Sequence, residues 1–305
     1  EVSVNGQTYT GKVVGDPGHL YYNVAVPSSQ LHEGTNDVHV KLTSHDKLGN
    51  EAVTEHQKTV TVDTHAENTV SIDEVTSDNI LNYKELGQKT HIITGLVGGD
   101  AKAGDEVTIE INHHYYVGHV ETINGQLGYQ IPVPSVEFSD NKGHVEKDVT
   151  FTAKVISHDA AGNEAINVVE HTVHVDNFAV NGLTIDTVAG EDWVSKAESD
   201  KNVIIRGAVT GDDAKAGDAV SVRVSSVDAS GKEVHHDYSG KVHVDSNGHL
   251  FYSVPVPPGG LYEGLDTVKV SITSHDLAGN TVTTSHTHDI AVDTHADATI
   301  SIDKV

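Results

Sequence analysis

The sequence contains no cysteine and no methionine, and basic residues are scarce: 19 Lys and Arg stand against 45 Asp and Glu, giving a formal net charge of −26. The absence of cysteine excludes disulfides, thiolate metal sites and cysteine nucleophiles. The acidic excess excludes nucleic-acid binding through a basic surface. No stretch approaches the roughly 20 apolar residues of a membrane span, so we expect no direct membrane insertion. Without an initiator methionine, we interpret the chain as a piece of a longer protein.

An internal repeat organises what is present. The heptapeptide Ser-His-Asp-x-x-Gly-Asn occurs at 44–50, 157–163 and 274–280, with spacings of 113 and 117 residues. Segments related to Val-Asp-Thr and Ser-Ile-Asp recur with the same two spacings. The repeat predicts the C-terminal part of one immunoglobulin-like module over 1–68, complete modules over 69–181 and 182–298, and the first strand of another module over 299–305.

Each module has the pattern of a β-sandwich. Apolar residues alternate at period two over 107–111, 149–155 and 268–273, which is typical of half-buried strands. Asn-Gly turn signals stand at 5–6, 124–125 and 247–248. About seven strands in about 115 residues match an immunoglobulin-like domain without its disulfide. We therefore predict an all-β fold of tandem immunoglobulin-like β-sandwiches joined by short acidic linkers.

The expected connections bring acidic residues together between modules. With the seven strands lettered A to G in chain order, the exit of strand G and the A–B loop share one end of the sandwich, which faces the B–C loop and the F–G turn of the next module. Carboxylates crowded there repel one another unless a cation joins them, and calcium accepts six to eight oxygen ligands of mixed type. The acids that this placement selects are Asp176, Asp293, Asp78, Glu85, Asp212, Asp213, Asp218 and Asp276.

Structural alternatives stay open for several of these acids. Asp159 and Asp276, like Asp46, stand where an aspartate caps its own turn through backbone N–H groups. The paired acids of the Asp-Ala-Lys-Ala-Gly-Asp loop, Asp100 and Asp105, are either solvated turn residues or metal ligands, and their repetition in both complete modules favours metal. Asp78 and Glu85 could reflect acidic composition alone.

Other motifs do not predict catalysis. Adjacent residues on a strand point to opposite faces, so the Ser-His-Asp segments cannot form a hydrolytic triad from their own three side chains. The sequence has no nucleophile elbow, phosphate-binding loop or HExxH element, and we expect no enzyme. His286 and His288 share a predicted strand face on which they either bind zinc or are simply solvated.

The ordered series of motifs resembles the bacterial immunoglobulin-like extender repeats of giant RTX adhesins. The motifs are Val-Asp-Thr, Ser-Ile-Asp, Asp-Asn-Ile-Leu-Asn, Gly-Gly-Asp-Ala-Lys-Ala-Gly-Asp and Ser-His-Asp-Ala-Ala-Gly-Asn. The resemblance implies type I secretion to the surface of a Gram-negative bacterium. It also implies calcium-rigidified modules that contact neighbouring repeats and hold an adhesive region, located elsewhere in the parent protein, away from the cell for attachment and biofilm formation.

The resemblance also implies a set of ligands. Its linker and B–C loop acids correspond here to Asp63, Asp176, Asp293, Asp100, Asp105, Asp213 and Asp218, and the Ser-Ile-Asp acids add Asp73 and Asp186. The third module departs from the pattern, because Glu191-Asp192-Trp193 replaces Asp-Asn-Ile, and Asn177 replaces threonine after Asp176. An alternative function is an immunoglobulin-like module that itself binds a carbohydrate or host protein, with the hairpin at 228–238 as the place to look.

Overall fold

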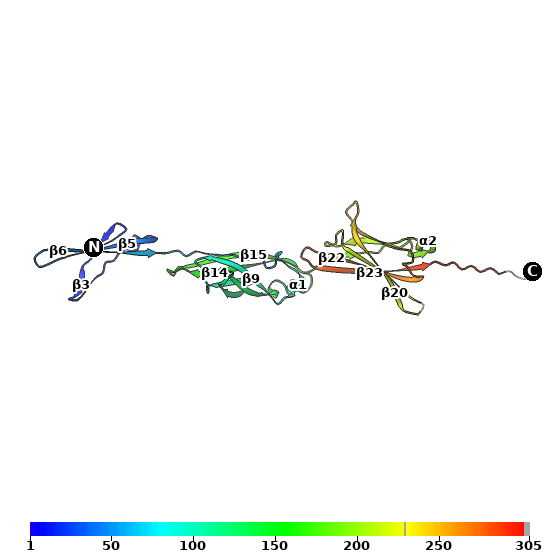
Figure 1. Cartoon of the computed structure of the whole chain (residues 1–305), viewed down its shortest axis with the longest axis horizontal. Helices are drawn as coiled ribbons and strands as arrows, with labels where there is room; N and C mark the ends of the chain where they lie inside the picture. Colours follow the sequence, from blue (N-terminus) through cyan, green and yellow to red (C-terminus); the bar gives the residue numbers. More distant parts are fainter. Residues whose placement is uncertain (229, 302–305) are drawn as a thin grey trace, which may run out of the picture. The chain divides into compact units, whose positions relative to one another are not determined.

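Strands form almost all of the regular structure in the computed structural model, which describes residues 1–228 and 230–301 (Figure 1). The two α-helices, α1 (Tyr83–Leu86) and α2 (Lys196–Ser199), are single turns. The prediction of an all-β chain of tandem immunoglobulin-like sandwiches is confirmed. Within the described residues, no helix has the length and apolarity needed to cross a membrane. Residue 229 of the predicted binding hairpin and residues 302–305 of the predicted last strand lie outside the described residues.

The chain divides into two compact units. Unit 1 contains residues 1–73, 93–131 and 151–171, and unit 2 contains residues 74–92, 132–150 and the chain from 172 onward. The boundary between the units therefore falls within 69–181, and the repeat boundaries drawn from the sequence stay a prediction.

Residues 1–62 form a hairpin-based sheet with a small core. The strands are β1 (Val2–Val4), β2 (Gln7–Tyr9), β3 (Val13–Asp16), β4 (His19–Tyr22), β5 (Gly34–His45) and β6 (Glu51–Val62), with a 3₁₀ turn at Ser28–Gln30. The sheet order is β2-β1-β5-β6, and β3 pairs with β4. Val2, Val4 and Asn36 are the buried residues of this segment, so few side chains hold it together.

Residues 68–176 form two sheets with the orders β11-β10-β14-β15-β8 and β12-β13-β9-β7. The strands are β7 (Asn68–Val70), β8 (Ile80–Leu81), β9 (Thr90–Gly99), β10 (Glu106–Ile111), β11 (His114–His119), β12 (Glu121–Ile123), β13 (Gln126–Pro134), β14 (Glu146–His158) and β15 (Glu164–Asp176), with a 3₁₀ turn at Ser135–Glu137. β14 is buried at every second residue from Val149 to Ser157, as the period-two pattern predicts.

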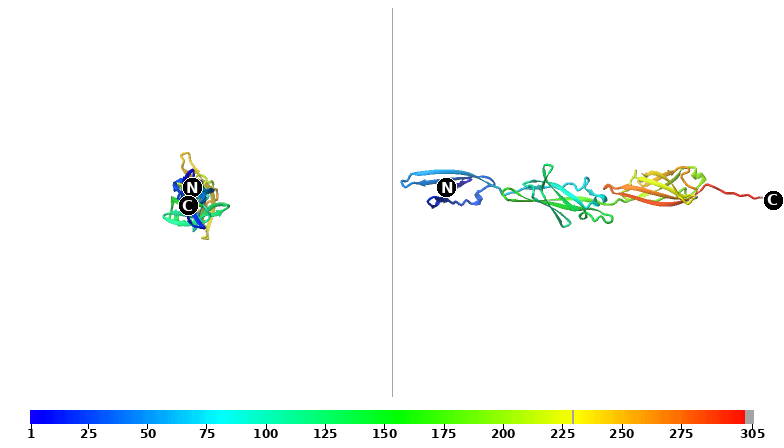
Figure 2. Two further views of the ribbon diagram at one scale, coloured as in Figure 1. Left: turned by 90° about the vertical axis from the view of Figure 1, so that its left-hand side faces the viewer. Right: turned by 60° about the horizontal axis from the view of Figure 1, so that its bottom comes forward.

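Residues 182–293 lie in unit 2 and are coloured from green to red in Figure 2. They form one continuous sheet of order β16-β18-β21-β20-β19-β22-β23-β17. The strands are β16 (Gly182–Leu183), β17 (Trp193–Ser195), β18 (Val203–Thr210), β19 (Ala219–Val227), β20 (Glu233–Val244), β21 (Leu250–Val256), β22 (Gly264–His275) and β23 (Thr281–Asp293). β20 pairs with β19 in its first part and with β21 in its last three residues, so it passes from one layer of the sandwich to the other. Alternate valines and isoleucines of both layers surround Tyr252 in the core.

Candidate metal site at the module junctions

Two short linkers follow the long β-hairpins and meet the loops of the next segment. The first linker is residues 63–67, between β6 and β7, and all its described contacts lie within unit 1. The second linker is residues 177–181, between β15 and β16, and it lies within unit 2. Each linker with the loops that it contacts is called a junction below.

The heptapeptide turns cap themselves. In the first complete module, Oδ1 of Asp159 accepts hydrogen bonds from the N–H groups of Gly162 (2.7 Å) and Asn163 (2.9 Å), and Oδ2 accepts from the Asn163 amide (2.7 Å). The same arrangement joins Asp276 to Asn280 and Asp46 to Asn50. The capping interpretation therefore describes all three turns, and any cation bound there has to share oxygens that are already hydrogen-bonded.

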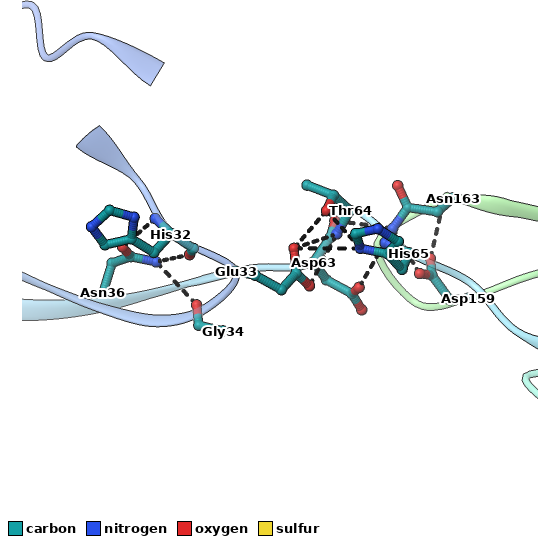
Figure 3. Close-up of polar contacts among 9 residues, drawn as sticks. All are labelled: His32, Glu33, Gly34, Asn36, Asp63, Thr64, His65, Asp159 and Asn163. Atoms are coloured by element: carbon teal, nitrogen blue, oxygen red, sulfur yellow. Dashed lines mark hydrogen bonds and ion pairs between the residues drawn. The ribbon is translucent and has the colours of Figure 1, made fainter. Parts of the chain in front are cut away.

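In two of the three heptapeptide turns, the last asparagine also contacts the end of the long hairpin that precedes its junction. Asn163 Nδ2 also donates to the backbone carbonyl of Asp63 at 2.9 Å (Figure 3). Asn280 Nδ2 donates in the same way to the carbonyl of Asp176 at 2.8 Å. One amide group thus bridges the turn aspartate and the end of the previous module, at both junctions. These asparagines were not among the predicted site residues, although their presence in all three heptapeptides is a signal in the sequence.

The B–C loops hold the linkers by a second repeated contact. Asp100 Oδ2 accepts the N–H of Glu67 (2.8 Å), and Asp213 Oδ2 accepts the N–H of Val180 (2.7 Å). The lysine of each loop donates from Nζ to the backbone carbonyl just before the heptapeptide aspartate. Lys102 donates to the His158 carbonyl at 2.9 Å, and Lys215 donates to the His275 carbonyl. These lysines were also missed, and they place positive charge beside the acids.

The second junction concentrates negative charge around Asp176. Desolvation raises the pKa of the Asp176 carboxyl, and the nearby carboxylates of Asp276, Glu146 and Asp213 raise it further, against the lowering effect of a hydrogen bond from the Phe178 N–H. A raised pKa means that the ionised form is destabilised where it stands. Asp213 and Asp276, which were predicted to lie near Asp176, therefore repel its negative charge.

The A–B segment lies against the second junction. Tyr83 N–H donates to Asn280 Oδ1 (2.8 Å), and the Asn82 amide donates to the Ala278 carbonyl (3.0 Å). Glu85 closes a capping box on Asn82, and Asp78 accepts from the Ile80 N–H within its own turn. The segment thus contacts the next module through amide groups, while both of its predicted acidic ligands are occupied by local hydrogen bonds.

The remaining predicted ligands are distributed unevenly. Asp105 and Asp218 accept the N–H groups of their loop lysines at 2.8 and 3.0 Å, and Asp212 is exposed. Asp73 accepts from the Thr94 hydroxyl (2.7 Å), and Asp186 contacts Arg206 (3.4 Å). Each of these two acids follows a short strand and finds its partner on the strand that pairs with it, β9 for Asp73 and β18 for Asp186. Asp293 repeats the local geometry of Asp63, since each accepts the N–H of the histidine two residues on.

The two linkers differ in how they are fixed. In the first, the Glu33 carboxylate accepts hydrogen bonds from the backbone N–H (3.2 Å) and the hydroxyl (2.5 Å) of Thr64. Residues 63, 64, 65 and 67 of this linker are exposed. In the second, buried Asn177 accepts the Val145 N–H (2.8 Å) and donates to two further oxygens. Phe178 stacks on His144 with ring centroids 4.3 Å apart. The replacement of threonine by Asn177 therefore produces a packed linker.

Side-chain acids alone do not complete a metal site. Across residues 1–228 and 230–301, no group of three or more His, Asp or Glu side chains is arranged to hold an ion. Near the junctions, however, the buried Oδ1 atoms of Asn68 and Asn181 accept no hydrogen bond. Calcium takes amide and backbone carbonyl oxygens as readily as carboxylates, so the donor chemistry of the junctions fits calcium if these oxygens contribute.

The alternative sites have other partners. The Ser157 hydroxyl accepts from Asn68, His158 contacts Glu164 (3.5 Å), and Asp159 caps its turn, so the Ser-His-Asp side chains diverge. In the described part of the hairpin at 228–238, Arg223 pairs with Asp237 (2.7 Å), and His236 stacks on Tyr262. His288 contacts Asp192 at 2.8 Å. These groups satisfy one another within their own module.

Comparisons with known proteins find similarity to solved structures of bacterial adhesins. No family model matches the sequence, and no curated protein matches it. A solved structure described as a Ca²⁺-stabilized adhesin that helps an Antarctic bacterium reach out and bind ice is 31% identical, with a TM-score of 0.59, over 97% of this chain. This chain spans 65% of that structure.

Two further structures agree. A structure from a 1.5-MDa bacterial ice-binding adhesin, described in terms of host cell surface retention, has a TM-score of 0.68 at 24% identity and covers 96% of this chain and 91% of its own, which shows the fold alone. A single bacterial immunoglobulin-like domain from the M. primoryensis ice-binding adhesin is 32% identical over 37% of this chain and all of that domain, with a TM-score of 0.31. The chain is similar to the tandem immunoglobulin-like repeats of giant bacterial adhesins.

Proposed function

We propose that this chain is a calcium-rigidified extender of a giant adhesin on the surface of a Gram-negative bacterium. Its modules act as spacers: they hold an adhesive region of the parent protein away from the cell, for attachment and biofilm formation, and catalyse no reaction. Calcium bound at the junctions restricts the linkers, so that length and stiffness are the functional properties. The Ca²⁺-stabilized relative supports this proposal.

The observation that carries the proposal is the charge at the second junction. Asp276, Glu146 and Asp213 all raise the pKa of Asp176, although Lys215 is close enough to donate to the neighbouring turn. Folding therefore brings like charges together at the point where two modules meet, which costs free energy without a counter-ion. A divalent cation converts this repulsion into a cross-link between modules.

The residues that hold the ion are proposed from this placement. Asp176 and Asp213 supply the carboxylates of the second junction, and Asp63 and Asp100 supply those of the first, because each pair joins a strand exit to the loop that binds the linker. Linker carbonyls and the unpaired Asn181 oxygen complete the set. Calcium suits such a mixed, irregular oxygen set better than magnesium, which requires a tight octahedron.

Small-angle scattering tests the proposal. We expect a longer maximum dimension in millimolar calcium than in chelator, with a midpoint on the order of 0.1–1 mM, the range of extracellular calcium modules. The double variant Asp176→Asn/Asp213→Asn should lose the part of this response that comes from the second junction. As a matched control, Asp37→Asn on exposed β5 should respond like the parent chain. Identical profiles with and without calcium would refute the proposal.

A further inference from the structure

One strand position carries three different residues in the three modules. Asn36 on β5 and Asp266 on β22 lie at the same register, opposite Val60 of β6 and Ile290 of β23. The repeat spacing places Val149 of β14 at the equivalent position. All three are buried, and Asn36 and Asp266 have no exposed surface. An amide, an apolar side chain and a carboxyl group therefore occupy equivalent interior positions.

The asparagine shows what this position requires in a polar residue. Asn36 Oδ1 accepts the His32 N–H (2.8 Å), and Nδ2 donates to the carbonyls of His32 (2.6 Å) and Gly34 (3.0 Å) (Figure 3). The same Oδ1 also accepts from the Asn5 amide (2.6 Å). The Asn36 side chain thereby closes the turn that leads into β5. The position uses one acceptor and one donor, and an ionised carboxylate has no donor.

Asp266 reproduces only the backbone N–H contact of Asn36. Oδ2 accepts the Tyr262 N–H at 2.8 Å, as Asn36 accepts the His32 N–H. Oδ1 takes the place of the asparagine Nδ2, and it is buried without a hydrogen-bond partner. The carbonyls that Nδ2 contacts in the first module have Tyr262 and Gly264 as their counterparts. A proton on Oδ1 would restore the missing donor.

The surroundings of Asp266 contain little that stabilises a negative charge. Ile290 faces it from β23, and the Ser226 hydroxyl of β19 donates to the Leu265 carbonyl (2.9 Å). His236 of β20 stacks on Tyr262 (5.0 Å), and the next acid on β23, Asp289, is held by Thr267. Burial raises the pKa of Asp266, and the Tyr262 N–H, Ser226 and His236 oppose this only in part.

We propose that Asp266 is kept as a neutral carboxylic acid in the folded protein and that its ionisation loosens the turn at 262–264. The acid proton on Oδ1 is donated to a backbone carbonyl of that turn. The turn also carries Glu263, whose carboxylate accepts from Thr294 through its N–H (3.2 Å) and hydroxyl (2.5 Å). The protonation state of Asp266 is thereby connected to the clamp on the segment that follows β23. The proposal does not depend on calcium.

The sign of the pH effect follows from linkage. A buried neutral acid has a higher pKa when folded than its unfolded value of about 3.9. Between these two values folding takes up a proton, so the stability that the acid contributes is complete below the unfolded pKa and is lost as pH rises through the folded pKa. In this window the unfolding constant of the third module increases up to about tenfold per pH unit.

Carboxyl NMR on the whole chain tests the proposal directly. With ¹³Cγ-labelled aspartate, in chelator throughout, one signal should keep its protonated chemical shift at pH values where the ordinary aspartates are ionised, and this signal should be absent from the Asp266→Asn variant. If every aspartate signal titrates at or below the ordinary value, the proposal is overturned.

Two matched variants make the result independent of assignment. Asp266→Asn should reduce the pH dependence of unfolding of the third module in urea, and its stabilising effect should grow as the pH rises above the ordinary pKa of an aspartate. Asn36→Asp should introduce in the first module the dependence that Asp266→Asn removes. Should both variants leave the pH profile of the parent chain unchanged, Asp266 is no proton switch.

Discussion

The two linkers are both held against the loops that follow them, but by different side-chain contacts. The second is buried and packed: Asn177 fills its turn, Phe178 stacks on His144, and the Asn82 and Tyr83 groups reach the next heptapeptide turn. The first is exposed and held by the Glu33–Thr64 clamp. Both keep the asparagine bridge and the B–C loop contact. The shared contacts hold each linker against the loops that follow it. Under the proposed function, the contacts that differ determine how much of the linker's stiffness depends on calcium.

Removing the buried linker asparagine should have the largest effect. Asn177→Ala removes the buried side chain that accepts the Val145 N–H, which costs about 1–3 kcal/mol. Thr64→Ala in the exposed first linker should cost less than about 1 kcal/mol, because water replaces the lost contacts. Urea unfolding of the two variants in chelator measures the difference. Equal losses would show that the linkers are fixed in the same way.

The asparagine bridge should come next. Asn280→Ala removes the contacts with both the Asp176 carbonyl and the Tyr83 N–H, whereas Asn50→Ala removes the same capping amide from a turn that contacts no linker in the structure. We expect a loss of about 1–2 kcal/mol for the first and less for the second. Hydrogen exchange at 82–84 should accelerate only in Asn280→Ala. Unchanged exchange there contradicts a bridging role.

Replacing Asp176 at the second junction should stabilise the chain without calcium and weaken the stabilisation that calcium gives. The raised pKa of Asp176 means that, without calcium, its contribution is most favourable below the ordinary value of 3.8 and is lost as pH rises through the folded value. Asp176→Asn should therefore stabilise the chain at pH 7 in chelator and weaken the stabilisation that calcium gives. Asp63→Asn is the matched variant at the first junction. A destabilised Asp176→Asn chain in chelator would contradict the repulsion.

The heptapeptide caps should give the smallest effect, with the opposite pH sign. The hydrogen bond from the Asn163 amide holds the pKa of Asp159 below its usual value, as the Asn50 amide does for Asp46. These caps stabilise the fold above the unfolded pKa, and the contribution is lost as pH falls through the lower folded value. Asp159→Ala should remove part of the stability gained between pH 2 and pH 5. An unchanged acid limb would show that the cap contributes nothing.

The β-sandwich fold was predictable because the alternation of apolar residues indicates strands and the internal repeat shows the same pattern in several modules. Val149 to Ser157 alternate in the sequence and alternate in burial, and the three heptapeptides fold into one turn. The loop connections of a sandwich also placed Asp176 near Asp213 and Asp276 correctly. Local and nonlocal signals agreed at these positions.

The side-chain partners were less predictable, because they depend on which group wins a shared hydrogen bond. Asp186 contacts Arg206, and Glu85 caps its own helix, although both resemble junction acids in sequence. Asn280 and Lys215 carry contacts between modules but have no acidic chemistry to draw attention. The equivalence of the buried positions of Asp266 and Asn36 is recognised only when burial and register are known together.

A crystal structure of the chain grown in abundant calcium tests the central claim most directly. The account predicts an anomalous peak at the second junction within about 2.3–2.6 Å of oxygens from Asp176 and Asp213, and a related one beside Asp63 and Asp100. Density for water alone at both places, with the carboxylates turned apart, would contradict it.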